Sequence, residues 1–382
     1  MNQPVAVEPK PFVLERAAPE TLGFHLPALE RLRKLIGGHI AEGRYPGAQI
    51  ALARHGKLAL FESFGNASLA PAKAADERTL WLLFSNTKVL TAAGVWALVE
   101  DGAMRFTDRV ADHLPEFARH GKGEVTLIQL LSHRGGFPSH EVPAACWADH
   151  ELMRKTVCDF TLEWTPGSRL QYHPRSAHWT AATLIEAVSG EDYRVFLRRR
   201  VIEPLGIGGE MFIGLPDAEH PRAATMHEPA GDAQAPLQLE NSAEARRAGI
   251  PSSGGYASAR AMAAFYQMLA QQGRLGGTRL FSPRLVQYVT RNATGDMVDT
   301  YMGMPMHRAL GPHVRGHTEG IRGLGSLASP RTFGHGGVGA SYCWADPDSG
   351  VSFAYLSNSR VPDPWHSLRM DVVSNLVHSA ID

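Results

Sequence analysis

Cysteine is scarce in this chain of 382 residues, which contains only Cys146, Cys158 and Cys343. None of the three belongs to a Cys-x-x-Cys pair, which argues against a disulfide framework and against a thiolate zinc site. Long apolar runs are missing too: residues 1–20 hold no continuous apolar segment, and no later window approaches about 18 uncharged apolar residues. We therefore expect a cytoplasmic protein with no membrane span.

An excess of charge of either sign is also absent, because 38 Lys and Arg balance 38 Asp and Glu. Nucleic acid and anionic surfaces lose their usual electrostatic attraction to such a protein, so a small, mostly uncharged substrate is the expected partner. The balance hides an asymmetry. All seven lysines lie at or before Lys155, so arginine supplies the positive side-chain charge of the remaining chain.

The length corresponds to roughly two domains. Strand patterns occur near both ends, at 48–54 and 57–65, which a hairpin would join, and at 341–346 and 351–357. Helical patterns cover 29–42, 85–100, 126–132, 177–189, 193–201, 258–272 and 365–381. We predict an α/β domain made of residues 1–84 and 246–382, with a mainly helical domain, residues 85–245, inserted and the active site at the junction.

The first motif that could carry chemistry is Ser85-Asn86-Thr87-Lys88. At helical spacing Lys88 can place its amine against Ser85 Oγ, and the N-terminal end of a helix favours a serine alkoxide. Apolar residues surround the motif at 80–84 and 89–93. A buried lysine needs a partner or a function, and its pKa can fall toward that of a base. The alternative is a helix cap at Ser85 with a snorkelling lysine.

Five blocks follow one another along the chain: LFSNTKVLTAAGVWALVEDG, LIQLLSHRGGFP, LEWTPGSRLQYHPRSAHW, IPSSGGYASARAMAAFYQMLAQQG and FGHGGVGASYCWADPDSGVSFAYLSN. In this order they resemble the serine β-lactamase-like hydrolases, and most closely the class C β-lactamase-related esterases, also called family VIII carboxylesterases. The resemblance extends over residues 20–380. It implies the α/β (α+β) fold of β-lactamases and penicillin-binding proteins, an antiparallel sheet flanked by helices plus an inserted, mainly helical domain.

The resemblance also implies roles for individual residues. Ser85 would be the acylated nucleophile, Lys88 its proton partner and Tyr172 the general base, which as an ionised phenol could take the serine proton. The backbone N–H groups of Ser85 and Val338 would form the oxyanion hole. Judged without the resemblance, Tyr172 is an ordinary half-buried aromatic residue.

The second motif of the family, Tyr-x-Asn, is incomplete in this chain. Two residues after Tyr172 stands Pro174, which offers no side-chain amide. His173 or Arg175 could substitute for the missing amide in contacts with the substrate or with Lys88.

The third motif of the β-lactamases, Lys-Thr-Gly, is absent because no lysine follows Lys155, and His335-Gly336-Gly337 stands in its place. The two glycines allow a strand backbone to approach the substrate closely. His335 could hydrogen-bond to Tyr172 or to the substrate, or be a strand-edge histidine. A histidine near neutrality suits uncharged esters, whereas a fixed lysine suits the carboxylate of a β-lactam or a peptide.

Two further residues are candidates for the substrate pocket. Trp147 lies in the loop after Pro138. Met304 shares one possible strand face with Met302 and Met306, since these three alternate with Gly303 and Pro305, although plain core packing explains the pattern equally well. The 18 histidines form no His-Glu-x-x-His pattern, so no metal and no other cofactor are expected. No Gly-x-Ser-x-Gly occurs, which argues against the α/β-hydrolase fold.

Taken together, these features predict a cofactor-independent serine carboxylesterase that hydrolyses small or medium uncharged esters through an acyl-enzyme on Ser85. The alternatives of the same fold are a β-lactamase, a D-amino-acid peptidase and an acyltransferase. A pseudoenzyme that binds a ligand is the non-enzymatic alternative, which only Pro174 and the missing third lysine favour. The expected partner is a small-molecule ester, with no nucleic acid and no membrane, and the oligomeric state is open.

Overall fold

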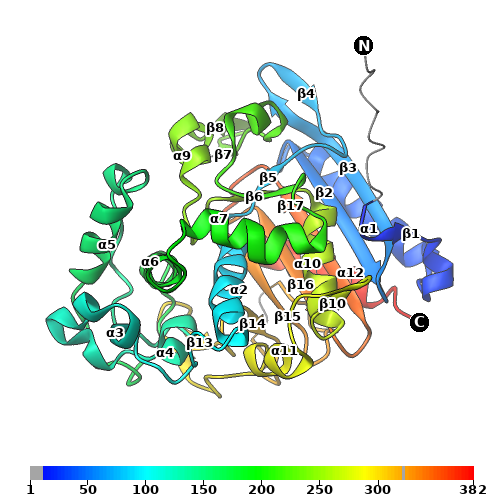
Figure 1. The fold of residues 1–382 in the computed structure, drawn as a ribbon. Coiled ribbons are helices and arrows are strands. Elements are labelled where there is room, and N and C mark those ends of the chain that lie inside the picture. Colours follow the sequence, from blue (N-terminus) through cyan, green and yellow to red (C-terminus); the bar gives the residue numbers. More distant parts are fainter. Residues whose placement is uncertain (1–11, 321–322) are drawn as a thin grey trace, which may run out of the picture.

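A β-sheet built from both ends of the chain forms the centre of the molecule (Figure 1). The computed structural model describes residues 12–320 and 323–382. The strand order is β1-β3-β2-β17-β16-β15-β14, and β4 pairs with the end of β3. These strands are β1 (Glu15–Arg16), β2 (Gly47–Arg54), β3 (Lys57–Leu69), β4 (Ala72–Ala74), β14 (His313–Val314), β15 (Phe333–Gly337), β16 (Ser341–Asp346) and β17 (Val351–Ser357). Neighbouring strands are antiparallel except β1 and β3, which are parallel.

The predicted hairpin turns at His55 and Gly56, whose φ angles are 52° and 80°. Two successive positive φ angles are typical of the tight turn that matches the twist of a β-hairpin. β3 extends beyond the predicted end at residue 65, because its last residues pair with β4.

The helices lie on both faces of the sheet and beside it (Figure 1). They are α1 (Leu26–Ala41), α2 (Thr87–Glu100), α3 (Val110–His113), α4 (Leu127–Leu131), α5 (His150–Cys158), α6 (Ser176–Ser189), α7 (Tyr193–Leu197), α8 (Gln238–Asn241), α9 (Ala243–Ala248), α10 (Ala259–Ala270), α11 (Pro283–Val289) and α12 (Trp365–His378). Short strand pairs and one three-stranded sheet connect them: β5 (Trp81–Leu82), β9 (Gly255–Ala257) and β6 (Met211–Ile213); β7 (His227–Ala230) and β8 (Ala233–Pro236); β10 (Arg274–Leu275) and β11 (Thr278–Arg279); β12 (Val298–Asp299) and β13 (Met304–Pro305).

Alternation along β2 shows how the two faces of the sheet are covered. Ile50 and Leu52 belong to a core that includes residues of α1 and α12, whereas Ala51 and Ala53 belong to a second core with residues of α2 and α10. Successive side chains of a strand point to opposite faces, so a strand between two helical layers is apolar throughout. This explains why β2 is buried along nearly its whole length.

Helix α2 is enclosed by other elements, and residues 87–98 are all buried. A helix that is apolar on all sides belongs in the interior of a protein. Gly94 allows α6 and α7 to pack closely on it, because a Cβ there would lie 2.8 Å from Ile185 Cδ1 and 2.7 Å from Leu197 Cδ2. The chain that leads into α2 is therefore held firmly in place.

The main predicted helices and strands are confirmed in type, as is the predicted fold class of sheet and flanking helices. The helix expected from Ser85 begins at Thr87, since Phe84–Asn86 form a 3-10 turn before it. The helix expected over 193–201 divides into α7 and a π-helical turn, Arg198–Ile202. The domain boundaries at residues 84 and 245 stay a prediction. Within residues 12–320 and 323–382, no helix is both long and apolar enough to cross a membrane.

Candidate active site

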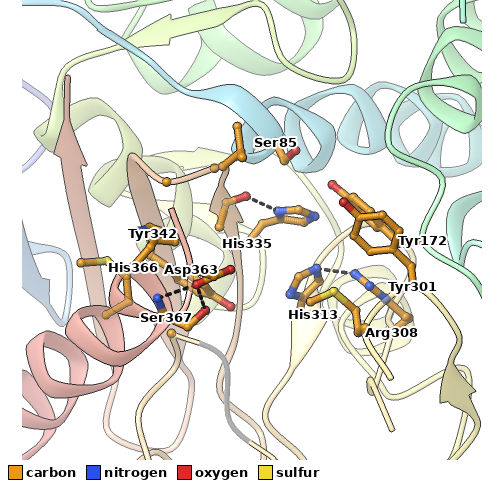
Figure 2. Close-up of a pocket in the computed structure, with 17 residues that line it drawn as sticks. Ser85, Tyr172, Tyr301, Arg308, His313, His335, Tyr342, Asp363, His366 and Ser367 are labelled. Carbon is orange, nitrogen blue, oxygen red and sulfur yellow. Dashed lines mark hydrogen bonds between the residues drawn. The ribbon is translucent and has the colours of Figure 1, made fainter. Parts of the chain in front are cut away.

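Ser85 lies in the 3-10 turn Phe84–Asn86 that leads directly into α2. The residue before it, Phe84, has a φ angle of 46°, in the left-handed region that a bulky residue rarely adopts. Packing stabilises this conformation, because the Phe84 ring is buried in a small apolar cluster with Leu82 and Tyr256. The turn presents Ser85 at the end of the helix, where it faces the aromatic side chains shown in Figure 2.

Lys88 is fully buried, and its Nζ lies 3.0 Å from Ser85 Oγ. The same nitrogen donates a hydrogen bond to the backbone carbonyl of Ser252, at 2.9 Å. Burial lowers the pKa of Lys88 well below its usual range, and the positive charges of Arg308 and Arg175 lower it further. The amine is therefore suited to accept a proton from the serine, and the snorkelling alternative does not apply to a side chain without exposure.

Tyr172 lies in the loop before α6, with its ring close to both Lys88 and Arg308. Lys88 Nζ is 5.2 Å and Arg308 Cζ is 4.8 Å from the ring centroid. Burial raises the pKa of Tyr172 to about 12, although a hydrogen bond with Ser85 and the charge of Arg308 act in the opposite direction. The phenol is thus protonated at neutral pH, which differs from the expected role of an ionised tyrosine as the acceptor of the serine proton.

His335 stands on β15 and faces the same space (Figure 2). Its Nδ1 donates to the carbonyl of Gly336 at 2.7 Å, and its ring centroid lies 6.1 Å from that of Tyr172. Burial and the neighbouring Lys88 lower the pKa of His335 well below its usual range. Its buried Nε2 has no hydrogen-bond partner within the described part of the chain. His335 is thus a neutral imidazole that offers an unused acceptor, and it does not hydrogen-bond to Tyr172.

Gly337 lets the end of β15 pack directly against the chain before Ser85. A Cβ on this residue would collide with the carbonyl oxygen of Leu83 and lie 3.0 Å from Phe84 Cβ. Val338 follows and is 56% exposed. Val338 lines both cavities described below together with Ser85, and the oxyanion hole formed by their backbone N–H groups stays a prediction.

Two cavities meet at Ser85. One, of about 190 Å³, extends past His335 to the start of α12, and the other, of about 250 Å³, extends past Trp147 toward α8 and β9. Four residues line both of them: Ser85, Tyr172, Tyr301 and Val338. A bond held at Ser85 would therefore have space on both sides, as cleavage of a two-part substrate requires.

The predicted pocket residues are only partly brought together. Gly336 and Gly337 line the first cavity with His335, and Trp147 lines the second cavity together with Pro174 and Arg175.

His173 and Met304 are among the lining residues of neither cavity. The His173 ring is buried, where Nε2 accepts from the backbone N–H of Phe137 and Nδ1 bonds to the carbonyl of Gln171. Met304 packs its methyl group against Gly320, and the neighbouring Met302 lines the first cavity instead. The expected substrate contacts of His173 and Met304 are therefore corrected.

Three residues of the site were not singled out from the sequence. The carbonyl of Ser252 receives the hydrogen bond from Lys88, and Tyr301 and Arg308 line the first cavity. Ser252 belongs to the block IPSSGGYAS that carried the resemblance, but a backbone carbonyl leaves no signal in a sequence. Tyr301 and Arg308 stand in a glycine-rich stretch without a motif.

In the described ranges, one group of side chains could ligate a metal: His150, Glu186 and Asp192. His150 Nδ1 lies 2.6 Å from Glu186 Oε1, and Arg194 Nη2 lies 3.1 Å from His150 Nε2. The Arg194 guanidinium also bonds to Asp192. The Arg194 guanidinium thus already balances the negative charge of this group. None of the three possible ligands lines the cavities beside Ser85.

Comparisons with known proteins agree with this geometry. A family model described as Beta-lactamase matches residues 32–373. The chain is 29% identical to "Esterase/beta-lactamase LipL" of Mycobacterium tuberculosis (strain ATCC 25618 / H37Rv) over 72% of this chain and 68% of that protein. Two solved structures, each 28% identical and each covering 92% of this chain, are a novel penicillin-binding protein homologue from Caulobacter crescentus (TM-score 0.81, 97% of that chain) and a family VIII carboxylesterase (TM-score 0.79, 98% of that chain). The resemblance and the fold inferred from the sequence are confirmed.

Proposed function

Because the chain belongs to the Beta-lactamase family, we propose that this serine hydrolase is a carboxylesterase that cleaves small or medium uncharged esters through an acyl-enzyme on Ser85. The observation that carries the proposal is the contact of a buried, low-pKa Lys88 with Ser85 at the meeting point of two cavities. The esterase names of the M. tuberculosis relative and of one solved structure support the choice of reaction.

In the first half of the reaction, Ser85 Oγ attacks the ester carbonyl and its proton passes to Lys88 Nζ. The backbone N–H groups of Ser85 and Val338 stabilise the negative oxygen of the tetrahedral intermediate. When the bond to the alcohol breaks, the protonated phenol of Tyr172 gives its proton to the leaving oxygen, and the ammonium of Lys88 restores it. Water then attacks the acyl carbonyl and gives a proton to Lys88 Nζ, and this proton passes to Ser85 Oγ when the acyl bond breaks, so that the acid leaves and the serine is regenerated.

The preference for uncharged esters rests on the charges around the cavities. Three arginines line them, and each is paired with a carboxylate: Arg308 with Asp299, Arg175 with Glu141, and Arg360 with Glu228 and Glu240. His335 is neutral because burial lowers its pKa. A substrate with a carboxylate would have to compete with these Asp and Glu side chains for the arginines, whereas an uncharged ester would not.

An amide-directed reaction is the second candidate, since one of these relatives is named an esterase/β-lactamase and another is a penicillin-binding protein homologue. Short-chain p-nitrophenyl esters and a chromogenic cephalosporin, each given to the native protein and to Ser85→Ala, separate the two. We expect ester turnover that disappears in Ser85→Ala and persists in Ser168→Ala, a control at an exposed serine. Ester turnover that survives in Ser85→Ala would refute the nucleophile, and faster cephalosporin turnover would favour the second candidate.

A further inference from the structure

Arg308 supplies a buried cation at a site whose third motif lacks the family's lysine. The residue follows β13, is 1% exposed and lines the cavity between Ser85 and α12. Its Nη2 donates to Asp299 Oδ2 at 2.6 Å, and its Nη1 contacts Nε2 of His313. Figure 2 shows Arg308 beside His313 and close to the ring of Tyr172.

The Asp299 carboxylate joins this cation to the backbone of Tyr172. Asp299 is fully buried, and its Oδ1 accepts hydrogen bonds from the backbone N–H groups of Tyr172 (3.1 Å) and Tyr301 (3.0 Å). One carboxylate therefore fixes the guanidinium, the main chain of Tyr172 and the main chain of the aromatic residue next to it. Any shift of Arg308 would be passed to Tyr172 through hydrogen bonds on a single side chain.

Stability alone does not account for this arrangement. Removing two charges from water offsets most of their attraction, so a buried ion pair is often no more stabilising than an apolar pair of similar size. The guanidinium, however, lies 4.8 Å from the centroid of the Tyr172 ring, within the range of a cation–π contact. A charge in this position acts on the ring and on any negative charge that its oxygen carries.

Of the ionisable groups around Tyr172, Arg308 is the permanent cation: Lys88 is an ammonium only while it holds the serine proton, and Asp299 is the anion paired with Arg308. His133 and His335 lie 4.8 Å and 6.1 Å from its ring, between centroids, and burial lowers the pKa of both well below the usual range. Burial also lowers the pKa of Lys88. The ionisable neighbours of the ring are Lys88 on α2, His133 after α4, Tyr301 and Arg308 in the chain around β13, and His335 on β15. Asp299 on β12 contacts the backbone N–H of Tyr172 instead.

We propose that Arg308 is a positioning residue for Tyr172: held by Asp299 and His313, it keeps the phenol directed toward Ser85 and stabilises the negative charge that remains when the phenol gives its proton to the leaving alcohol. The inference rests on the proposed esterase reaction. It goes beyond that reaction in assigning the electrostatic support of the acid to an arginine outside the three motifs.

The test compares two esters with the same acyl group, p-nitrophenyl butyrate and ethyl butyrate. p-Nitrophenolate leaves without a proton, whereas ethoxide needs one, so a defect confined to Tyr172 affects the ethyl ester selectively. For Arg308→Met we expect kcat/KM to fall by about 10- to 100-fold on the ethyl ester and by less than about threefold on the p-nitrophenyl ester. In the Tyr172→Phe background, Arg308→Met should have no further effect beyond about twofold, because the two residues act as a unit.

Arg308→Lys keeps a positive charge, so its activity on the ethyl ester should lie between those of Arg308→Met and the native protein. If Arg308→Met does not fold, Arg308→Lys takes its place in the comparison with Tyr172→Phe. Arg331→Met, at an exposed arginine paired with Asp348, is the matched control. Equal losses on both esters, or a loss that persists in the Tyr172→Phe background, would overturn the proposal while leaving the esterase intact. If the native protein hydrolyses neither ester, the proposed function fails first and the role of Arg308 falls with it.

Discussion

The serine wall of the site, residues 84–88, is one continuous stretch of chain at the entrance to a helix buried on all sides. The tyrosine wall opposite it comes from three separated segments: Tyr172, Arg308 and His335 line the cavity, and Asp299 forms a buried ion pair with Arg308 behind them. The serine wall depends on helix geometry and apolar packing. The tyrosine wall depends on hydrogen bonds and charges that act over long sequence separations, so a single substitution there can disturb several parts of the site.

Lys88→Met removes the amine from the serine wall and should have the largest effect on activity. Without Nζ beside Ser85 Oγ, no buried base receives the serine proton, and we expect kcat to fall by about 10³-fold with KM little changed. Steady-state ester hydrolysis measures this, with Lys155→Met, at an exposed lysine paired with Glu151, as the control. If kcat of Lys88→Met stayed within tenfold of the native value, the activation free energy would change by less than about 1.4 kcal/mol. That result would contradict the assignment of Lys88 as the base.

The pH profile examines the same amine without a substitution. Because burial lowers the pKa of Lys88, the amine stays neutral at pH values where an ordinary lysine is protonated. Activity should therefore be present below the pKa of an ordinary lysine and be lost as the pH falls through the lowered pKa, since the ammonium cannot accept the serine proton. A kcat/KM that rises only near the pKa of an ordinary lysine would show that Lys88 is not the base.

Asp299→Asn changes the tyrosine wall at the carboxylate that holds both Arg308 and the backbone of Tyr172. The change leaves a buried guanidinium without a charged partner, so we expect the free energy of unfolding to fall by about 3 kcal/mol. On the serine side, Thr91→Val removes one buried hydrogen bond, from Thr91 Oγ1 to the carbonyl of Pro251, and should lower it by about 1 kcal/mol. Urea unfolding measures the free energy of unfolding of both variants. Equal losses in Asp299→Asn and Thr91→Val would show that the tyrosine wall is no more sensitive to a single substitution than the serine wall.

The same contrast decides how much of the site could be predicted from the sequence. Ser85 and Lys88 are three residues apart across the 3-10 turn and the start of α2, so their contact follows from local geometry, and the apolar flanking residues indicate that the lysine is buried. Tyr172 and Asp299 are 127 residues apart, and neither Asp299 nor Arg308 belongs to a motif. A pairing of this kind exists only once the chain between the two residues has folded.

The elements show the same division between local and long-range information. Strands 341–346 and 351–357 were predicted with their observed bounds, because period-two patterns are local. The direction of the His173 side chain could not be predicted, since it depends on the backbone N–H of Phe137, 36 residues away, as a hydrogen-bond donor.

Gly337→Ala tests the place where the two walls touch. A Cβ there would collide with the carbonyl of Leu83, so β15 and Val338 must move away from Ser85. We expect kcat to fall by about 10-fold, less than for loss of a complete oxyanion donor, because the backbone N–H is displaced rather than removed. Gly209→Ala, where a Cβ would have no neighbour within 4 Å, is the matched control. Full activity in Gly337→Ala would mean that Val338 contributes nothing to the oxyanion hole.

Trp147→Ala should have the smallest effect, because Trp147 lines the second cavity without contributing a polar group to the reaction. Its half-buried indole offers apolar surface to a substrate, and losing part of that contact should raise KM for a larger ester by about five- to tenfold while an acetate ester is hardly affected. The measurement is kcat and KM for p-nitrophenyl acetate and octanoate. Since the substitution leaves both walls in place, kcat should not change. A fall in kcat for acetate would show that the loop bearing Trp147 supports the tyrosine wall, and the two regions would then not be energetically separate.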